Sequence, residues 1–179
     1  MIIDFRVKNF LSFKGEQTLS FVANNRDKSM PEAIIDPQLA GAEFAKIRLL
    51  KGLVIYGANA AGKTNTLSAL GFLKSMVQGS ATDLDEGDPI HVHPFKFDPN
   101  TPNEPTEFFV RFIVEGVRYH FALVLNKERI LEESLSAFPK GREQVWYARS
   151  WDDSEQDYTW GPARPTDYRR DANLVKYTR

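Results

Sequence analysis

GANAAGKTN, residues 57–65, is the stretch that decides the fold, because its first eight residues match the Walker A pattern G-x-x-x-x-G-K-[ST]. The glycines let the backbone turn tightly enough for consecutive N–H groups to converge on phosphate oxygens. Lys63 adds a positive charge for the β and γ phosphates, and Thr64 places a hydroxyl where Mg²⁺ binds a nucleotide. The predicted phosphate site consists of Gly57, Ala58, Asn59, Ala60, Ala61, Gly62, Lys63, Thr64 and Asn65.

The residues on either side of this loop satisfy two further requirements of the motif. The apolar run LLKGLVIYG, residues 49–57, precedes it and is typical of a strand. Thr66, Leu70, Leu73 and Val77 follow at helical spacing. A chance match in a Gly/Ala-rich turn would not be flanked by an apolar strand and an amphipathic helix. We therefore predict an α/β P-loop NTPase domain whose sheet has a parallel core around residues 49–56.

The N-terminal region has the pattern of a hairpin and a long loop. Residues 2–7 and 17–22 alternate apolar and polar side chains, which predicts two antiparallel strands. Residues 24–42 contain asparagines, prolines and a glycine without a sustained period, which favours a loop. The acidic, glycine-containing residues 78–89 should end the helix that follows the Walker A loop.

The second half of the sequence is almost wholly β in character. Residues 108–114 and 117–125 alternate around Glu115-Gly116, which predicts a hairpin. Residues 129–138 and 143–151 have the composition of two more strands. We therefore divide the chain, as the N-terminal portion of one domain, into residues 1–93 with the loop and helix, an antiparallel β-subdomain at 94–165, and a linker or truncated segment at 166–179.

Composition excludes several classes of protein. The chain has 179 residues, enough for one folded domain, and a formal net charge of −1, which provides no general attraction for nucleic acid. It has no cysteine, so disulfides, thiolate metal sites and cysteine nucleophiles are excluded. Charged residues interrupt the apolar residues at the N-terminus, which is unlike a signal peptide or a membrane span. We expect a cytoplasmic protein without membrane contact.

Two classes of P-loop protein fit poorly. A GTPase reads guanine with N-K-x-D, and the nearest stretch, residues 126–129, reads NKER and lacks the aspartate. A small nucleotide kinase usually opens on its P-loop and continues with alternating helices and strands. Here more than fifty residues precede the loop, and the remainder is predicted to be antiparallel.

A third class matches individual residues. VKNFLSF, at residues 7–13, precedes a loop of the form G-x-N-x-x-G-K-T-N, and this arrangement resembles the N-terminal lobe of prokaryotic ABC-type ATPase heads of the SMC and RecF kind. Asn59 and Asn65 match the asparagines that flank the lysine in those proteins. HPFKFDP at 93–99 and the later strands look like the AAA/ABC-type ATPases of abortive-infection and other anti-phage systems.

The resemblance implies a head that binds ATP and Mg²⁺ and pairs with a second head as a homodimer or hetero-assembly. Closure around two nucleotides would then act on an effector protein or a nucleic acid. Phosphate and magnesium roles carry over to Gly57, Asn59, Gly62, Lys63 and Thr64, and residues 9–13 are expected near the base or the phosphate loop.

Hydrolysis in such heads also needs carboxylates at the end of an apolar strand and a Ser-Gly-rich signature helix. None of Asp36, Asp83, Asp85, Glu86 and Glu115 follows a suitable strand, so we identify no catalytic residue. We therefore expect ATP hydrolysis only in a longer protein or an assembly, with little by this chain alone. The alternatives are a non-hydrolysing nucleotide-binding module completed by a partner chain, and a structural module that keeps the P-loop shape without using it.

Other clusters have plainer explanations. His91 and His93 could begin a metal site on one face of a strand, but a third ligand is missing nearby, and His120 should pack in the sheet. Glu132 and Glu133 are adjacent and should point to opposite faces of a strand, unlike a catalytic carboxylate pair. Trp146, Trp151 and Trp160 should cover a β-core, whereas Tyr168, Arg169, Arg170, Lys176, Tyr177 and Arg179 form either a solvated tail or a nucleic-acid grip.

Overall fold

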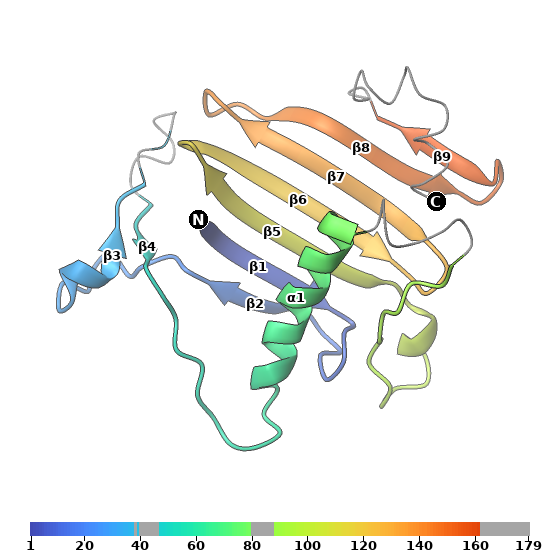
Figure 1. The fold of residues 1–179 in the computed structure, drawn as a ribbon, viewed down its shortest axis with the longest axis horizontal. Helices are drawn as coiled ribbons and strands as arrows, with labels where there is room; N and C mark the ends of the chain where they lie inside the picture. Colours follow the sequence, from blue (N-terminus) through green and yellow to red (C-terminus); the bar gives the residue numbers. More distant parts are fainter. Residues whose placement is uncertain (38, 40–46, 80–87, 162–179) are drawn as a thin grey trace.

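The computed structural model describes residues 1–37, 39, 47–79 and 88–161. Seven antiparallel strands form one sheet in the order β2-β1-β5-β6-β7-β8-β9, and a helix crosses one of its faces (Figure 1). A separate two-stranded sheet pairs β3 with β4. The elements are β1 Ile2–Lys8, β2 Gln17–Ser20, η1 Pro31–Ala33, β3 Ile34–Ile35, β4 Leu49–Leu50, α1 Lys63–Gly79, η3 Thr101–Asn103, β5 Thr106–Val114, β6 Val117–Leu125, β7 Ile130–Phe138, β8 Gln144–Asp152 and β9 Asp157–Trp160.

The predicted N-terminal hairpin is confirmed, and it belongs to the large sheet. β1 pairs antiparallel with β2, with Phe5 opposite Leu19. Ile3, Phe5 and Val7 are buried, as their alternation predicts. The other edge of β1 pairs with β5, about a hundred residues later in the chain. The first strand therefore lies inside the sheet.

The predicted strands of the second half are also present. β5 and β6 form a hairpin in which Glu115 and Gly116 both have positive φ, 50° and 75°, as a type I′ turn requires. β7 and β8 lie within one residue of the predicted runs. Strand β9, whose four residues pair with the end of β8, was not predicted.

Helix α1 covers the face of the sheet that is rich in phenylalanine. Its buried residues Ala69, Leu73 and Met76 recur at helical spacing and join the main core cluster. Phe72 stacks on Phe108 of β5 with ring centroids 5.3 Å apart. Val77, predicted to lie on the buried stripe, is 62% exposed because the stripe passes through position 76 instead.

The predicted parallel core around residues 49–56 is wrong within the part of the chain that the structure describes. Only Leu49–Leu50 form a strand, and this strand is antiparallel to Ile34–Ile35. Residues 53–56 are extended but pair with no described segment, and Val54 and Tyr56 are 86% and 89% exposed. An apolar run forms a parallel core strand only when neighbouring strands lie beside it, and no described residues do.

Asn9, directly after β1, connects distant parts of the chain. It is buried and has a positive φ of 53°, a conformation that asparagine tolerates better than most residues. Its side-chain nitrogen donates hydrogen bonds to the carbonyl oxygens of Thr101, Glu104 and Pro105 at 2.8, 2.9 and 3.2 Å. Its side-chain oxygen accepts one from the Phe95 backbone N–H at 3.0 Å. One amide therefore fixes the segment that leads from α1 into β5.

We predict that Asn9→Ala lowers the free energy of unfolding by about 3 kcal/mol, since it leaves several buried backbone groups without their partner. Urea denaturation of the two proteins measures the difference. Asn103→Ala is the control, because Asn103 is exposed and should change stability by no more than about 0.5 kcal/mol. Equal stability of Asn9→Ala and the parent protein would contradict the role of this amide.

The face of the sheet opposite α1 carries an aromatic cluster around His120. Its ring centroid lies 4.4 Å from that of Phe138 and 5.7 Å from that of Phe109. The Arg118 guanidinium lies 3.8 Å from the Phe138 centroid. Burial, followed by the charges of Arg118 and Arg111, lowers the pKa of His120 to about 4. The prediction that this histidine packs in the sheet is confirmed.

This pKa makes stability depend on pH. In the unfolded chain a histidine binds a proton below about pH 6.5, whereas folded His120 stays neutral until about pH 4. Protonation of the unfolded state therefore lowers stability as the pH falls from 6.5 to 4. We expect His120→Phe to flatten this decline in denaturation curves, whereas substitution of the exposed His91 by Gln should not. An unchanged slope in His120→Phe would contradict the prediction.

Candidate functional site

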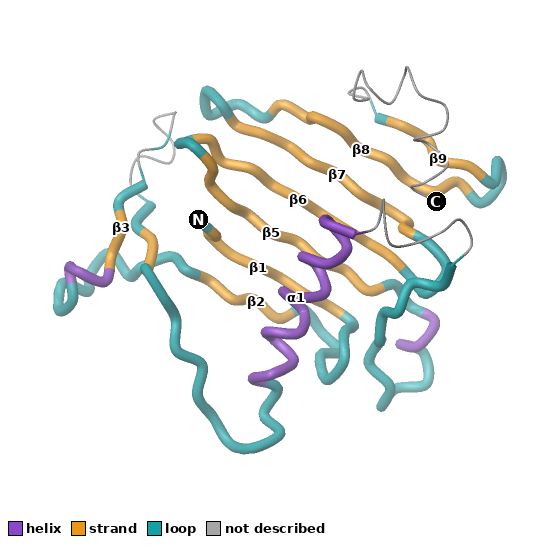
Figure 2. Tube along the Cα trace, in the orientation of Figure 1, coloured by secondary structure: helices purple, strands orange, loops and turns teal. Residues whose placement is uncertain are grey.

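The Walker A stretch forms a turned loop that runs directly into α1 (Figure 2). Residues 57–62 make the turn, and Lys63 is the first residue of the helix. Ala60 and Gly62 have positive φ values of 62° and 87°, which curl the backbone immediately before the helix. The free N–H groups and the positive end of the helix dipole at such a terminus favour an anion.

Lys63 lies across this loop. Its Nζ donates hydrogen bonds to the carbonyl oxygens of Gly57 and Ala58 at 2.8 and 2.7 Å. The loop thus folds around the ammonium group, and both contacts are exposed to solvent. An incoming phosphate can take over these hydrogen bonds, because an anion is a stronger acceptor for an ammonium group than a neutral carbonyl.

A second loop, between β1 and β2, supports the Walker A loop from the side. The Asn65 side-chain nitrogen donates a hydrogen bond of 2.6 Å to Ser12 Oγ. The Phe13 ring lies against Gly62, where a Cβ atom would be only 3.1 Å from Phe13 Cε1. With its φ of +87°, position 62 accepts glycine without strain and no other residue.

The structure divides the roles expected for residues 9–13. Ser12 and Phe13 contact the Walker A loop, while Asn9 is buried and holds the segment that contains Phe95 and Thr101. Asn9 therefore affects the site indirectly, by fixing the segment that contains Phe95 and Thr101. The motif at residues 7–13 predicted that residues 9–13 lie near the Walker A loop. It gave no signal for the buried hydrogen bonds of Asn9.

Neither of the two described carboxylates considered for catalysis lies at this site. Asp36 follows the two-residue strand β3, and Glu115 is exposed in the β5–β6 turn. Asp83, Asp85 and Glu86 lie outside the described residues, as does the basic tail from Tyr168 onward. Among the residues the structure describes, no group of three or more His, Asp or Glu side chains could hold a metal ion. His91 and His93 are exposed in a segment that is not a strand.

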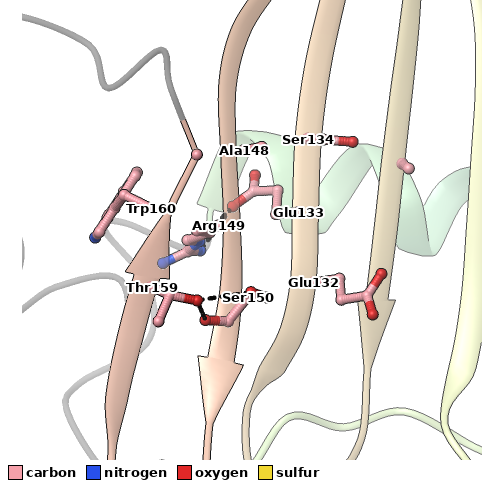
Figure 3. A pocket seen from close by; sticks show the side chains of 10 residues that line it. Glu132, Glu133, Ser134, Ala148, Arg149, Ser150, Thr159 and Trp160 are labelled. Atoms are coloured by element: carbon pink, nitrogen blue, oxygen red, sulfur yellow. Dashed lines mark hydrogen bonds and ion pairs between the residues drawn. The ribbon is translucent and has the colours of Figure 1, made fainter.

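A shallow pocket of about 450 Å³ lies away from the Walker A loop, on the face of the sheet opposite α1 (Figure 3). Its lining combines small side chains with Glu132, Glu133, Arg149 and Trp160. Glu133 is held by Arg149 at 2.7 Å and by the Tyr147 hydroxyl at 3.0 Å. The two glutamates therefore do not form a catalytic pair, as their adjacency predicts.

Trp146 and Trp151 pack against aromatic side chains of other strands, as predicted, whereas Trp160 lines the pocket. Trp151 packs against Tyr158 with centroids 5.2 Å apart and lies under the guanidinium of Arg129 at 4.1 Å. Trp146 packs edge-on against Tyr119 at 5.2 Å.

A model of a known protein family matches more than half of the chain. Residues 53–177 match the family described as "AAA domain, putative AbiEii toxin, Type IV TA system". The chain belongs to this AAA-domain family. The matched region contains the Walker A loop, α1 and the whole of strands β5 to β9. No curated protein and no solved structure matches.

Membership of the AAA-domain family has two direct consequences. AAA domains are P-loop NTPases, so the prediction of a P-loop ATPase family is confirmed, and nucleotide binding is the class of function that the family suggests.

The fold of this AAA domain is α/β with a mostly antiparallel sheet. Within the described residues, no helix has both the length and the apolar character needed to cross a membrane.

We predict that the Ser12–Asn65 hydrogen bond contributes coupling energy between the two loops. In a double-mutant cycle with Ser12→Ala and Asn65→Ala, the coupling in unfolding free energy should be about 1 kcal/mol. Ser12→Ala combined with Ser75→Ala is the control and should be additive, because Ser75 hydrogen-bonds only within α1, to Gly71. Additivity of the Ser12 and Asn65 substitutions would show that the contact is not formed in solution.

Proposed function

We propose that this AAA domain binds ATP with Mg²⁺ at the Walker A loop. The observation that carries the proposal is the position of Lys63, whose ammonium group lies in the turn of the loop at the N-terminus of α1. The loop backbone and Lys63 would bind the β and γ phosphates, and the Thr64 hydroxyl would bind the metal ion. Mg²⁺ there would neutralise phosphate charge and fix the geometry of the triphosphate.

We further propose that the chain acts as the N-terminal lobe of an ABC/SMC-like ATPase head. Two observations support this. The β1–β2 loop, which contains the NFLSF segment, contacts the Walker A loop through Ser12 and Phe13. The apolar residues 53–56 lie exposed beside that loop without a strand partner among the described residues. Residues outside the described part, or a partner chain, would complete the sheet and supply the carboxylates for hydrolysis.

In this proposal ATP binding brings two heads together, and their closure acts on an effector protein in anti-phage defence or on a nucleic acid. The description of the family refers to a toxin, which favours a role in defence. The alternative of a non-hydrolysing or purely structural module is supported by one observation. Lys63 already has two hydrogen-bond partners within its own loop.

Replacement of Lys63 by Ala tests the nucleotide-binding proposal. We expect a loss of ATP affinity on the order of hundredfold or more, which is what removal of two charge-assisted hydrogen bonds to phosphate costs. Calorimetric titration with ATP and Mg²⁺ measures the affinity, and circular dichroism should show an unchanged fold.

Lys74→Ala is the matched control, since Lys74 is exposed on the same helix and should leave ATP affinity unchanged. If Lys63→Ala binds ATP as tightly as the parent protein, the nucleotide site is wrong and the structural alternative is favoured.

A further inference from the structure

A third loop, residues 93–101, contacts the β1–β2 loop, which itself contacts the Walker A loop. The Leu11 backbone N–H donates to the His93 carbonyl oxygen at 2.7 Å, and the Lys14 ammonium lies 2.6 Å from the Asp98 carboxylate. Because the β1–β2 loop also contacts the Walker A loop, all three are connected by direct contacts. Figures 1 and 2 show them along the same edge of the molecule.

The backbone of this third loop is held firmly. The Thr101 hydroxyl hydrogen-bonds the carbonyl oxygens of Phe95 and Asp98 at 2.6 and 3.1 Å, and Thr101 is buried. The Asp98 carboxylate accepts a hydrogen bond from the Asn100 N–H at 2.9 Å. The hydrogen bond from Lys14 lowers the pKa of Asp98, so the ion pair persists at neutral pH. The loop is therefore ordered before any ligand arrives.

Phe97 stands out from this fixed backbone and is 91% exposed. Single exposed apolar side chains are common on protein surfaces. This one differs because its loop is anchored to the β1–β2 loop, the same loop that contacts the Walker A loop. The partly buried Phe95 ring also meets the Phe97 ring at 5.7 Å and 66°, which supports it from one side. A positioned aromatic ring in water is a platform for stacking a flat, aromatic ligand.

We propose that Phe97 stacks on the base of the nucleotide whose phosphates bind the Walker A loop. The inference rests on the proposed function. The phosphates would lie at the N-terminus of α1, the sugar would pass Ser12 and Lys14, and the base would reach Phe97. Stacking on one aromatic ring contributes affinity for any base and little discrimination between bases.

The test separates the base from the phosphates by using two probes, ATP and inorganic tripolyphosphate, each with Mg²⁺. Phe97→Ala should weaken ATP binding about tenfold, the size expected for the loss of one base–aromatic stack. It should leave tripolyphosphate binding unchanged, because that probe has no base. Phe97→Trp should keep ATP affinity at or above that of the parent protein. Val77→Ala is the control, because Val77 is an exposed apolar residue of α1. It should change neither the ATP affinity nor the tripolyphosphate affinity.

Each other outcome overturns the proposal in a different way. Unchanged ATP affinity in Phe97→Ala places the base elsewhere. Equal losses for ATP and tripolyphosphate show that Phe97 supports the loop and does not bind the base. If the parent protein binds neither probe, the proposed function itself fails and the base site fails with it.

Discussion

The side-chain amide of Asn9 is the interaction on which the arrangement of the site depends. It ends β1 in a conformation with positive φ and joins that end to the carbonyl oxygens of the segment before β5. β1 and β5 are neighbours in the sheet, so the amide connects two strands that are distant in sequence. The β1–β2 loop and the 93–101 loop are both positioned by this single buried group. Any ligand contact that either loop makes depends on it.

The Walker A loop relies on that arrangement. The positive φ of Ala60 is costly for a residue other than glycine and persists where surrounding structure holds it. Phe13 fills the space beside Gly62, and Ser12 hydrogen-bonds the first turn of α1 through Asn65. The Phe72 ring anchors the middle of the helix to the sheet through Phe108. The loop is therefore held from the β1–β2 side and from the helix side.

Local sequence patterns predicted much of this fold. The predictions that failed concern strand pairing and contacts between residues that are distant in sequence. The alternation around Glu115-Gly116 and the G-x-x-x-x-G-K-T match depend on neighbours in sequence, so both could be identified. The pairing partners of a strand could not be identified from sequence. For this reason residues 49–56 were predicted to form a parallel sheet, which the described residues do not form. Asn9 and Phe97 lie in the two quoted motifs, but the sequence contained no signal for the contacts of Asn9 or of the Phe97 loop, which are made across more than eighty residues.

The unpaired residues 53–56 bear on whether the domain works alone. A continuous apolar run is typical of a strand covered on both faces, yet Val54 and Tyr56 are exposed. Residues 53–56 pair with no other segment that the structure describes, and strand addition by another segment would satisfy both their backbone groups and their apolar side chains. The family match begins at Leu53, so the run belongs to the shared domain and is not an irregularity of this chain. Because the same run leads directly into Gly57, a strand added there would lie next to the phosphate loop. In the proposed ATPase head, the catalytic half would be completed beside residues 53–56.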